Sequence, residues 1–140
     1  MRWGFFVLIA LAFSSRAVPA AELVMFESST CEWCAIWDEE VGVIYDKTSE
    51  SRVAPLRRVD YHDPRPPELQ DLKQIVYTPT FVLMDQGREI GRIIGYPGES
   101  YFWELLQALI SKLPPQAFGC DQGRIMASNE RAPKKENRVC

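Results

Sequence analysis

Two cysteines separated by two residues, Cys31 and Cys34, constrain the fold of this chain more than any other feature. They follow Leu23–Phe26, a short apolar run typical of a buried strand. After them, apolar side chains recur at the i, i+4, i+7 and i+8 positions of one amphipathic helix face, namely Trp37, Val41, Ile44 and Tyr45. The pair therefore lies where a strand turns into a helix, with Cys31 at the helix N-terminus and Cys34 one turn further on.

The position of this pair predicts a reversible disulfide. Side chains three residues apart on a helix lie about 5–6 Å apart at Cβ, so the two sulfur atoms can join without unwinding the turn. The helix N-terminus stabilises a thiolate at Cys31, and the thiolate is the form that attacks another disulfide. We interpret Cys31 and Cys34 as the dithiol of a thiol–disulfide exchange protein.

Two other interpretations of the pair are weaker. A tetrahedral zinc site needs two further ligands, and the chain offers only His62, Cys120 and Cys140, which form no second closely spaced pair. A purely structural disulfide across two residues closes too short a loop to add much stability. We therefore expect neither a metal nor a cofactor at this site.

Residues 1–20 are predicted to be a secretory signal peptide. The basic start Met1-Arg2 precedes an apolar run, Trp3–Phe13, that is too short to cross a bilayer. Small residues at Val18 and Ala20 favour cleavage after Ala20. An uncleaved N-terminal anchor is the alternative. Export would place the protein in an oxidising compartment, the periplasm, where disulfides are common.

Length and charge limit the classes of partner. The chain has 140 residues, enough for one domain, and 16 basic against 19 acidic residues. Because the chain is acidic, we do not expect it to bind nucleic acid or an anionic membrane surface. We expect a monomer.

The remaining patterns predict one α/β domain at residues 21–113. Further strands are expected at residues 54–61, 80–84 and 88–94, the last two forming a hairpin across the turn Gln86-Gly87. A short helix beginning at Pro67 is expected to carry Leu69, Leu72 and Ile75. A long amphipathic helix carries Phe102, Leu105, Leu106, Leu109, Ile110 and Leu113. The order β-α-β-α-β-β-α predicts a mixed four-stranded sheet with helices on both faces.

This order, with a dithiol at the start of the first helix, resembles the thioredoxin fold. The segment Phe26–Cys34 is similar to the active-site strand and loop of periplasmic thioredoxin-like proteins. Thr78-Pro79 resembles the cis-proline segment of the family, and Gly95 matches a glycine that thioredoxins carry before their last helix. Within the family, the chain resembles the small exported thioredoxins encoded with bacterial sulfur-oxidation (Sox) systems, the SoxS type.

The resemblance implies a role for each matching residue. Cys31 would attack a substrate disulfide and Cys34 would resolve the mixed disulfide. Pro79 would follow a cis peptide bond, and Thr78 would offer backbone contacts to the substrate. Trp33 and Tyr77 are candidates for an apolar rim, although surface aromatic residues without a role remain an equal alternative for Trp33.

One departure from the family concerns proton transfer. Thioredoxin has a buried aspartate six positions before its first cysteine, and Met25 stands there in this chain. Glu27 is a candidate to take over that role because it is near in sequence, but strand alternation puts it on the opposite face from Phe26. Glu22, water or another group are the alternatives.

The SoxS likeness also implies partners. The protein would reduce disulfides on periplasmic proteins, including the sulfur carrier of a Sox system, with electrons from a membrane thiol transporter. The same chemistry run as an oxidase or isomerase, and a copper-binding thiol module, are the alternatives.

The polar tail at residues 114–140 contains Cys120 and Cys140, which would pair with each other, stay free or bridge to another chain.

Overall fold

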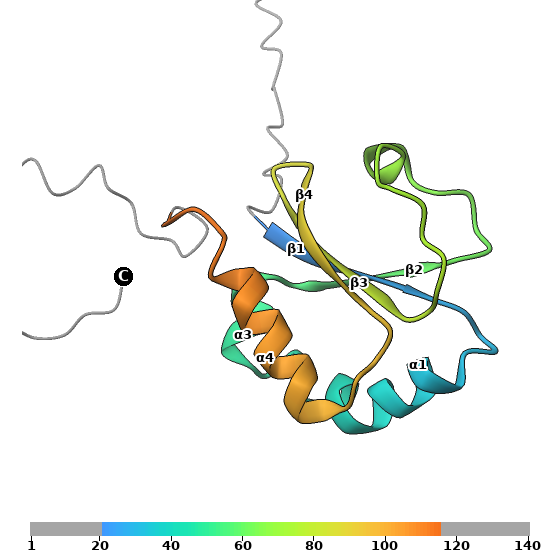
Figure 1. Ribbon diagram of the computed structural model, residues 1–140, viewed down its shortest axis with the longest axis horizontal. Coiled ribbons are helices and arrows are strands. Elements are labelled where there is room, and N and C mark those ends of the chain that lie inside the picture. Colours follow the sequence, from blue (N-terminus) through green and yellow to red (C-terminus); the bar gives the residue numbers. More distant parts are fainter. Residues whose placement is uncertain (1–20, 116–140) are drawn as a thin grey trace, which may run out of the picture.

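The sheet has four strands and two packed faces (Figure 1). The structure is a computed structural model, and it describes residues 21–115. Its strands are β1 (Ala21–Glu27), β2 (Leu56–Asp60), β3 (Thr80–Asp85) and β4 (Arg88–Ile94), and their order in the sheet is β2-β1-β3-β4. β1 pairs with β2 in parallel and with β3 in antiparallel, and β3 pairs with β4 in antiparallel. The predicted mixed four-stranded sheet is confirmed.

Alternating side chains of the central strands build two separate cores. Leu23 and Met25 of β1 face the larger core, which is covered by the helices α1 (Glu32–Trp37) and α4 (Glu99–Ile110). Val24 and Phe26 face the smaller core on the other side of the sheet. All four side chains are almost fully buried, as expected for a central strand that is covered on both faces.

The helix after Cys31 consists of two α-helical segments separated by a π-helical turn. These are α1 (Glu32–Trp37), a π-helical turn η1 (Asp38–Gly42) and α2 (Val43–Tyr45). The predicted apolar face is correct for Trp37, Val41 and Tyr45, which are fully buried, but Ile44 is 40% exposed. The π turn is wider than an α turn, so Ile44, expected at the i+7 position of the buried face, rotates away from the core. The short helix α3 (Ser49–Val53) then leads to β2.

The helix expected after Pro67 is only a single 3-10 turn, η2 (Pro67–Leu69). Leu69, Leu72 and Ile75 are nevertheless buried in the smaller core, so the apolar spacing correctly predicted burial but not a longer helix. Figure 1 shows this segment on the side of the sheet away from α1, α3 and α4.

The C-terminal half agrees closely with the sequence patterns. Gln86 and Gly87 have φ values of 49° and 75°, as a tight turn between β3 and β4 requires. The helix α4 (Glu99–Ile110) buries the expected stripe except Leu105, which is 45% exposed. None of the helices at residues 21–115 is long and apolar enough to cross a membrane. The predicted signal peptide and both tail cysteines lie outside the described residues.

Candidate active site

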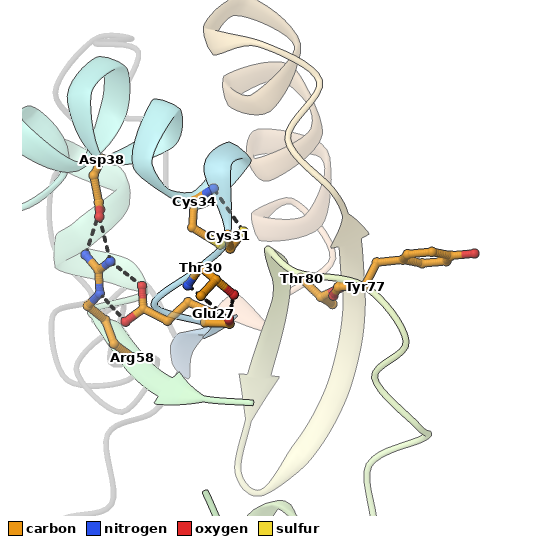
Figure 2. The surroundings of a disulfide bond; sticks show 9 residues. Glu27, Thr30, Cys31, Cys34, Asp38, Arg58, Tyr77 and Thr80 are labelled. Carbon is orange, nitrogen blue, oxygen red and sulfur yellow. Dashed lines mark hydrogen bonds and ion pairs between the residues drawn. A yellow bond between two sulfur atoms is a disulfide. The ribbon is translucent and has the colours of Figure 1, made fainter. Parts of the chain in front are cut away.

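Cys31 and Cys34 form a disulfide at the start of α1 (Figure 2). Their Cα atoms are 5.2 Å apart. Cys31 is the N-cap of the helix, and its Sγ accepts a hydrogen bond of 3.1 Å from the backbone N–H of Cys34. This bond satisfies one of the N–H groups that a helix leaves unpaired at its first turn. The predicted position of the pair at a strand-to-helix junction is confirmed.

The two sulfur atoms differ in accessibility. Cys34 is 3% exposed and belongs to the larger core, whereas Cys31 is only partly buried at its edge. A sharp turn before the helix presents Cys31, since its backbone N–H donates to the Ser28 carbonyl at 3.0 Å. An incoming disulfide therefore meets Cys31 first.

A groove of about 250 Å³ begins at Trp33, which lies between the two cysteines in the chain, and is also lined by Thr78, Ile94, Gly95, Tyr96 and Pro97. The Thr78–Pro79 peptide bond is cis, as predicted, and the Pro79 carbonyl accepts a hydrogen bond of 2.8 Å from the Gly95 N–H. Gly95 has a φ of 79°, which suits a residue without a side chain. The structure thus brings Trp33 and Thr78 together at one groove. Tyr77 is 66% exposed and does not line it.

Tyr96 and Glu40 hold this groove in place, and the sequence patterns did not identify either residue. The Tyr96 hydroxyl donates a hydrogen bond of 2.5 Å to Glu40 Oε2, which joins the loop after β4 to η1. Burial, followed by the carboxylates of Glu40 and Glu99, raises the pKa of Tyr96 above its ordinary value. Tyr96 therefore stays protonated and keeps its donor at neutral pH.

A polar pocket of about 270 Å³ lies beside the pair. Both cysteines line it, together with Glu27, Ser28, Ser29, Ala35, Asp38 and Asp60. Figure 2 shows Arg58 between Glu27 and Asp38, near the cysteine pair. Arg58 Nε donates to Glu27 Oε1 at 2.8 Å, its Nη2 also contacts Glu27, and its Nη1 donates to Asp38 Oδ1 at 2.7 Å.

Glu27 therefore lies on the face that strand alternation predicted, opposite to Phe26. Met25 is fully buried in the larger core and provides no titratable group. Glu22 points away from the cysteines, because it shares the face of Val24 and pairs with Arg57 at 3.5 Å.

Arg58 was not identified from the sequence, and only the β1–β2 register, which pairs it with Met25, reveals its position. At residues 21–115 we find no group of three His, Cys, Asp or Glu side chains suited to a metal ion.

No protein-family profile and no curated protein matches the chain. Among solved structures, the chain is similar to the crystal structure of the periplasmic thioredoxin SoxS from Paracoccus pantotrophus in its reduced form. The identity is 46%, the match covers 66% of this chain and 97% of that chain, and the TM-score is 0.63. A mutant thioredoxin from Halobacterium salinarum NRC-1 matches at 19% identity, covering 65% of this chain and 75% of that chain, with a TM-score of 0.49. Malassezia sympodialis thioredoxin matches at 18% identity, covering 66% and 76%, with a TM-score of 0.48.

The similarity to SoxS extends over nearly the whole of that protein. The fold described above agrees with it, and so does a cysteine pair at the N-terminus of α1. Such a pair performs thiol–disulfide exchange, because an accessible sulfur and a neighbouring resolving sulfur are what the reaction needs. The chain is therefore a thiol–disulfide oxidoreductase that belongs to the thioredoxin-like superfamily and, within it, to the SoxS type.

Proposed function

We propose that this oxidoreductase works as a reductant of disulfides on partner proteins in the periplasm. The observation that carries the reductant direction is the exposed carboxylate of Glu32 between the two cysteines, which disfavours the reduced thiolate. The exchange chemistry itself is supported by the difference between the two sulfur atoms of the pair. Cys31 caps the helix at an accessible edge, and Cys34 is almost fully buried behind it. An attacking thiolate needs access, whereas a resolving thiol needs only to reach its neighbour.

In the proposed reaction, the Cys31 thiolate attacks one sulfur of the partner's disulfide. A mixed disulfide forms, and the other partner sulfur leaves as a thiolate. Cys34 then loses its proton and attacks the Cys31 sulfur, which releases the second partner sulfur and forms the Cys31–Cys34 disulfide. The partner gains two electrons and the oxidoreductase loses two. A membrane thiol-electron donor would return the protein to its reduced form.

The groove beside the pair is the proposed docking site for the partner. Trp33 is 57% exposed and would contact apolar side chains of the bound segment. Thr78 lines the same groove and would offer backbone hydrogen bonds, with Pro79 beside it. Glu27 lines the polar pocket together with Cys34, which supports its proposed role in removing the Cys34 proton.

Export and the nature of the partner rest on the sequence and on the relative. The SoxS structure is described as a periplasmic thioredoxin, and residues 1–20 have the pattern of a signal peptide. We propose that residues 21–113 form the exported, monomeric domain, followed by a polar tail at residues 114–140. The proposed partner is the sulfur carrier of a Sox system.

Trapping of mixed disulfides tests this function. A Cys34→Ser variant, exported in a bacterium with an active Sox system, should accumulate a mixed disulfide with its partner, because the resolving thiol is missing. A Cys31→Ser/Cys34→Ser variant is the matched control and should trap nothing. A sulfur carrier protein in the trapped complex would support the proposal. Complexes with many newly exported proteins, but none with a sulfur carrier, would favour the oxidase or isomerase function instead.

A further inference from the structure

Asp38 lies one helical turn after Cys34, at the start of the π turn. Its backbone N–H donates to the carbonyls of Cys34 and Ala35, and its side chain lines the same polar pocket as Cys34. Residues four apart on a helix are neighbours on its surface. The Asp38 carboxylate is therefore on the side of the helix from which Cys34 meets the pocket.

Arg58 links this carboxylate to the one on β1. Its Nη1 and Nη2 donate to Asp38 at 2.7 Å and 2.8 Å, and its Nε and Nη2 bind Glu27. Hydrogen bonds to Glu27 and then to Asp38 raise the pKa of Arg58, which keeps it charged. One guanidinium thus faces two carboxylates, and the group carries one net negative charge.

Gly42, the last residue of the π turn, leaves the space for this arrangement. A Cβ atom at Gly42 would lie 2.9 Å from Asp38 Oδ1 and 3.2 Å from Trp37 Cζ3, so a larger residue would push against the carboxylate. Gly42 has an ordinary helical φ of −55°, so its backbone conformation does not require glycine, and a side chain here would displace the Asp38 carboxylate or the Trp37 ring. π turns are frequent at functional sites.

We propose that Asp38 and Arg58 are positioning residues that set the charge beside Cys34 and thereby control how readily Cys34 loses its proton in the resolving step. This inference rests on the proposed role of Cys34 as the resolving thiol. In that step the Cys34 proton passes to a base or to water in the pocket. The Cys34 thiolate then attacks Cys31, and the bond between Cys31 and the substrate sulfur breaks.

Asp38 and Arg58 carry opposite charges, so they should affect loss of the Cys34 proton in opposite directions. A negative neighbour disfavours a thiolate and a positive neighbour favours it. The other charged groups near Cys34 are Glu27 and Asp60, which line the pocket, and Glu32, which is exposed at the start of α1. Removing the charge of Asp38 should therefore ease loss of the proton, and removing that of Arg58 should hinder it.

The resolving step can be followed with 5,5′-dithiobis(2-nitrobenzoate) on the reduced full chain, in which Cys120→Ser and Cys140→Ser remove the tail thiols. Attack by Cys31 releases one nitrothiobenzoate, and resolution by Cys34 releases a second one in an intramolecular step. The rate of the second release is measured against pH for the parent protein, Asp38→Asn and Arg58→Met. Arg57→Met is the matched control, because Arg57 also pairs with two glutamates but on the opposite face of the sheet.

The midpoint of the second release should move to lower pH in Asp38→Asn and to higher pH in Arg58→Met, and it should not move in Arg57→Met. Side chains of Arg58 and Asp38 are 40% and 42% exposed, so solvent screens their charges. We expect shifts of about half a pH unit, equal to about a threefold change in rate below the midpoint. Arg58 also joins β2 to η1, so Asp38→Asn, which keeps the shape of the side chain, is the decisive variant.

A purely structural role would slow the second release in both variants without opposite shifts, and that result would overturn the inference. An unchanged midpoint in Asp38→Asn would overturn it as well. Failure of the parent protein to release a second nitrothiobenzoate would overturn both the inference and the proposed role of Cys34. Failure of the Cys34 role is thus distinguishable from failure of the inference alone, because it is seen in the parent protein without any variant.

Discussion

The Tyr96 hydroxyl donates a hydrogen bond of 2.5 Å to Glu40 and ties the loop after β4 to the helix that carries the cysteines. Tyr96 also lines the groove beside Trp33. Its ring packs on Phe102 of α4 at a centroid distance of 6.2 Å. One side chain therefore connects the groove, the active-site helix and the larger core.

Loss of this hydrogen bond should weaken substrate binding in the groove and lower the stability of the fold only slightly. Tyr96→Phe removes only the hydroxyl, and because Glu40 is exposed we expect a decrease of about 0.5–1 kcal/mol in the free energy of unfolding. The KM for a disulfide-bearing protein substrate should rise by several fold. Chemical denaturation and steady-state reduction assays measure the two effects. Tyr101→Phe, at a tyrosine that is 65% exposed, is the control and should change neither.

Stability should fall at alkaline pH because of two tyrosines. Burial first, then Glu50 and Asp46, raise the pKa of Tyr45, and burial with Glu40 raises that of Tyr96. Above pH about 10 the unfolded chain releases these protons while the folded protein keeps them, so the free energy of unfolding decreases as pH rises.

Tyr45→Phe should flatten this decrease. The variant should also lose about 1–2 kcal/mol at neutral pH, because the Tyr45 hydroxyl donates to the Ala54 carbonyl at 2.8 Å in the buried core. Urea denaturation from pH 7 to 11 gives both quantities. An unchanged pH dependence in Tyr45→Phe would show that its ionisation does not contribute.

Sequence periodicity predicted the strands and α4, because the strands are covered on both faces and α4 turns one apolar stripe toward the larger core. It failed at Ile44, where a π turn changes the helical pitch, and at Pro67, where residues reach the core from a 3-10 turn and a loop. In the site, Cys31, Cys34 and Pro79 were found from local motifs. Arg58, Asp38, Tyr96 and Glu40 were not, because their contacts join segments that only the strand register and the packing bring together.

The two thiols of the reduced protein should react with iodoacetamide at very different rates. Cys31 caps the helix and is accessible, whereas Cys34 is 3% exposed, so we expect Cys31 to react at least tenfold faster at pH 7. Mass spectrometry of peptides after short exposure locates the modified thiol. Equal rates at the two positions would contradict the assignment of Cys31 as the attacking thiol.

Removal of the tail should leave the domain intact. The last residue of the apolar stripe is Leu113, which is 5% exposed, so a chain ending there retains the larger core. We expect the cooperative thermal transition and the rate of disulfide reduction to be unchanged within error. A lost transition would show that residues after Leu113 contribute to the core.

The direction of electron flow depends on the charge between the cysteines. Glu32 is exposed within the first turn of α1, and a carboxylate there disfavours the reduced thiolate that a positive group would stabilise. Glu32→His should therefore raise the reduction potential of the pair. Glu39→His, at an exposed glutamate that does not line the polar pocket, is the control and should have a smaller effect.

The most direct test of the reductant function is the reduction potential of the Cys31–Cys34 pair itself, measured by equilibration with glutathione or dithiothreitol buffers. A reductant should have a potential near that of thioredoxin, about −270 mV, rather than near the oxidant DsbA, about −120 mV. Because about 30 mV corresponds to 1.4 kcal/mol, these two ends differ by about 7 kcal/mol in disulfide stability. A value close to −270 mV is predicted here, and a value above about −160 mV would contradict the reductant function and favour the oxidase.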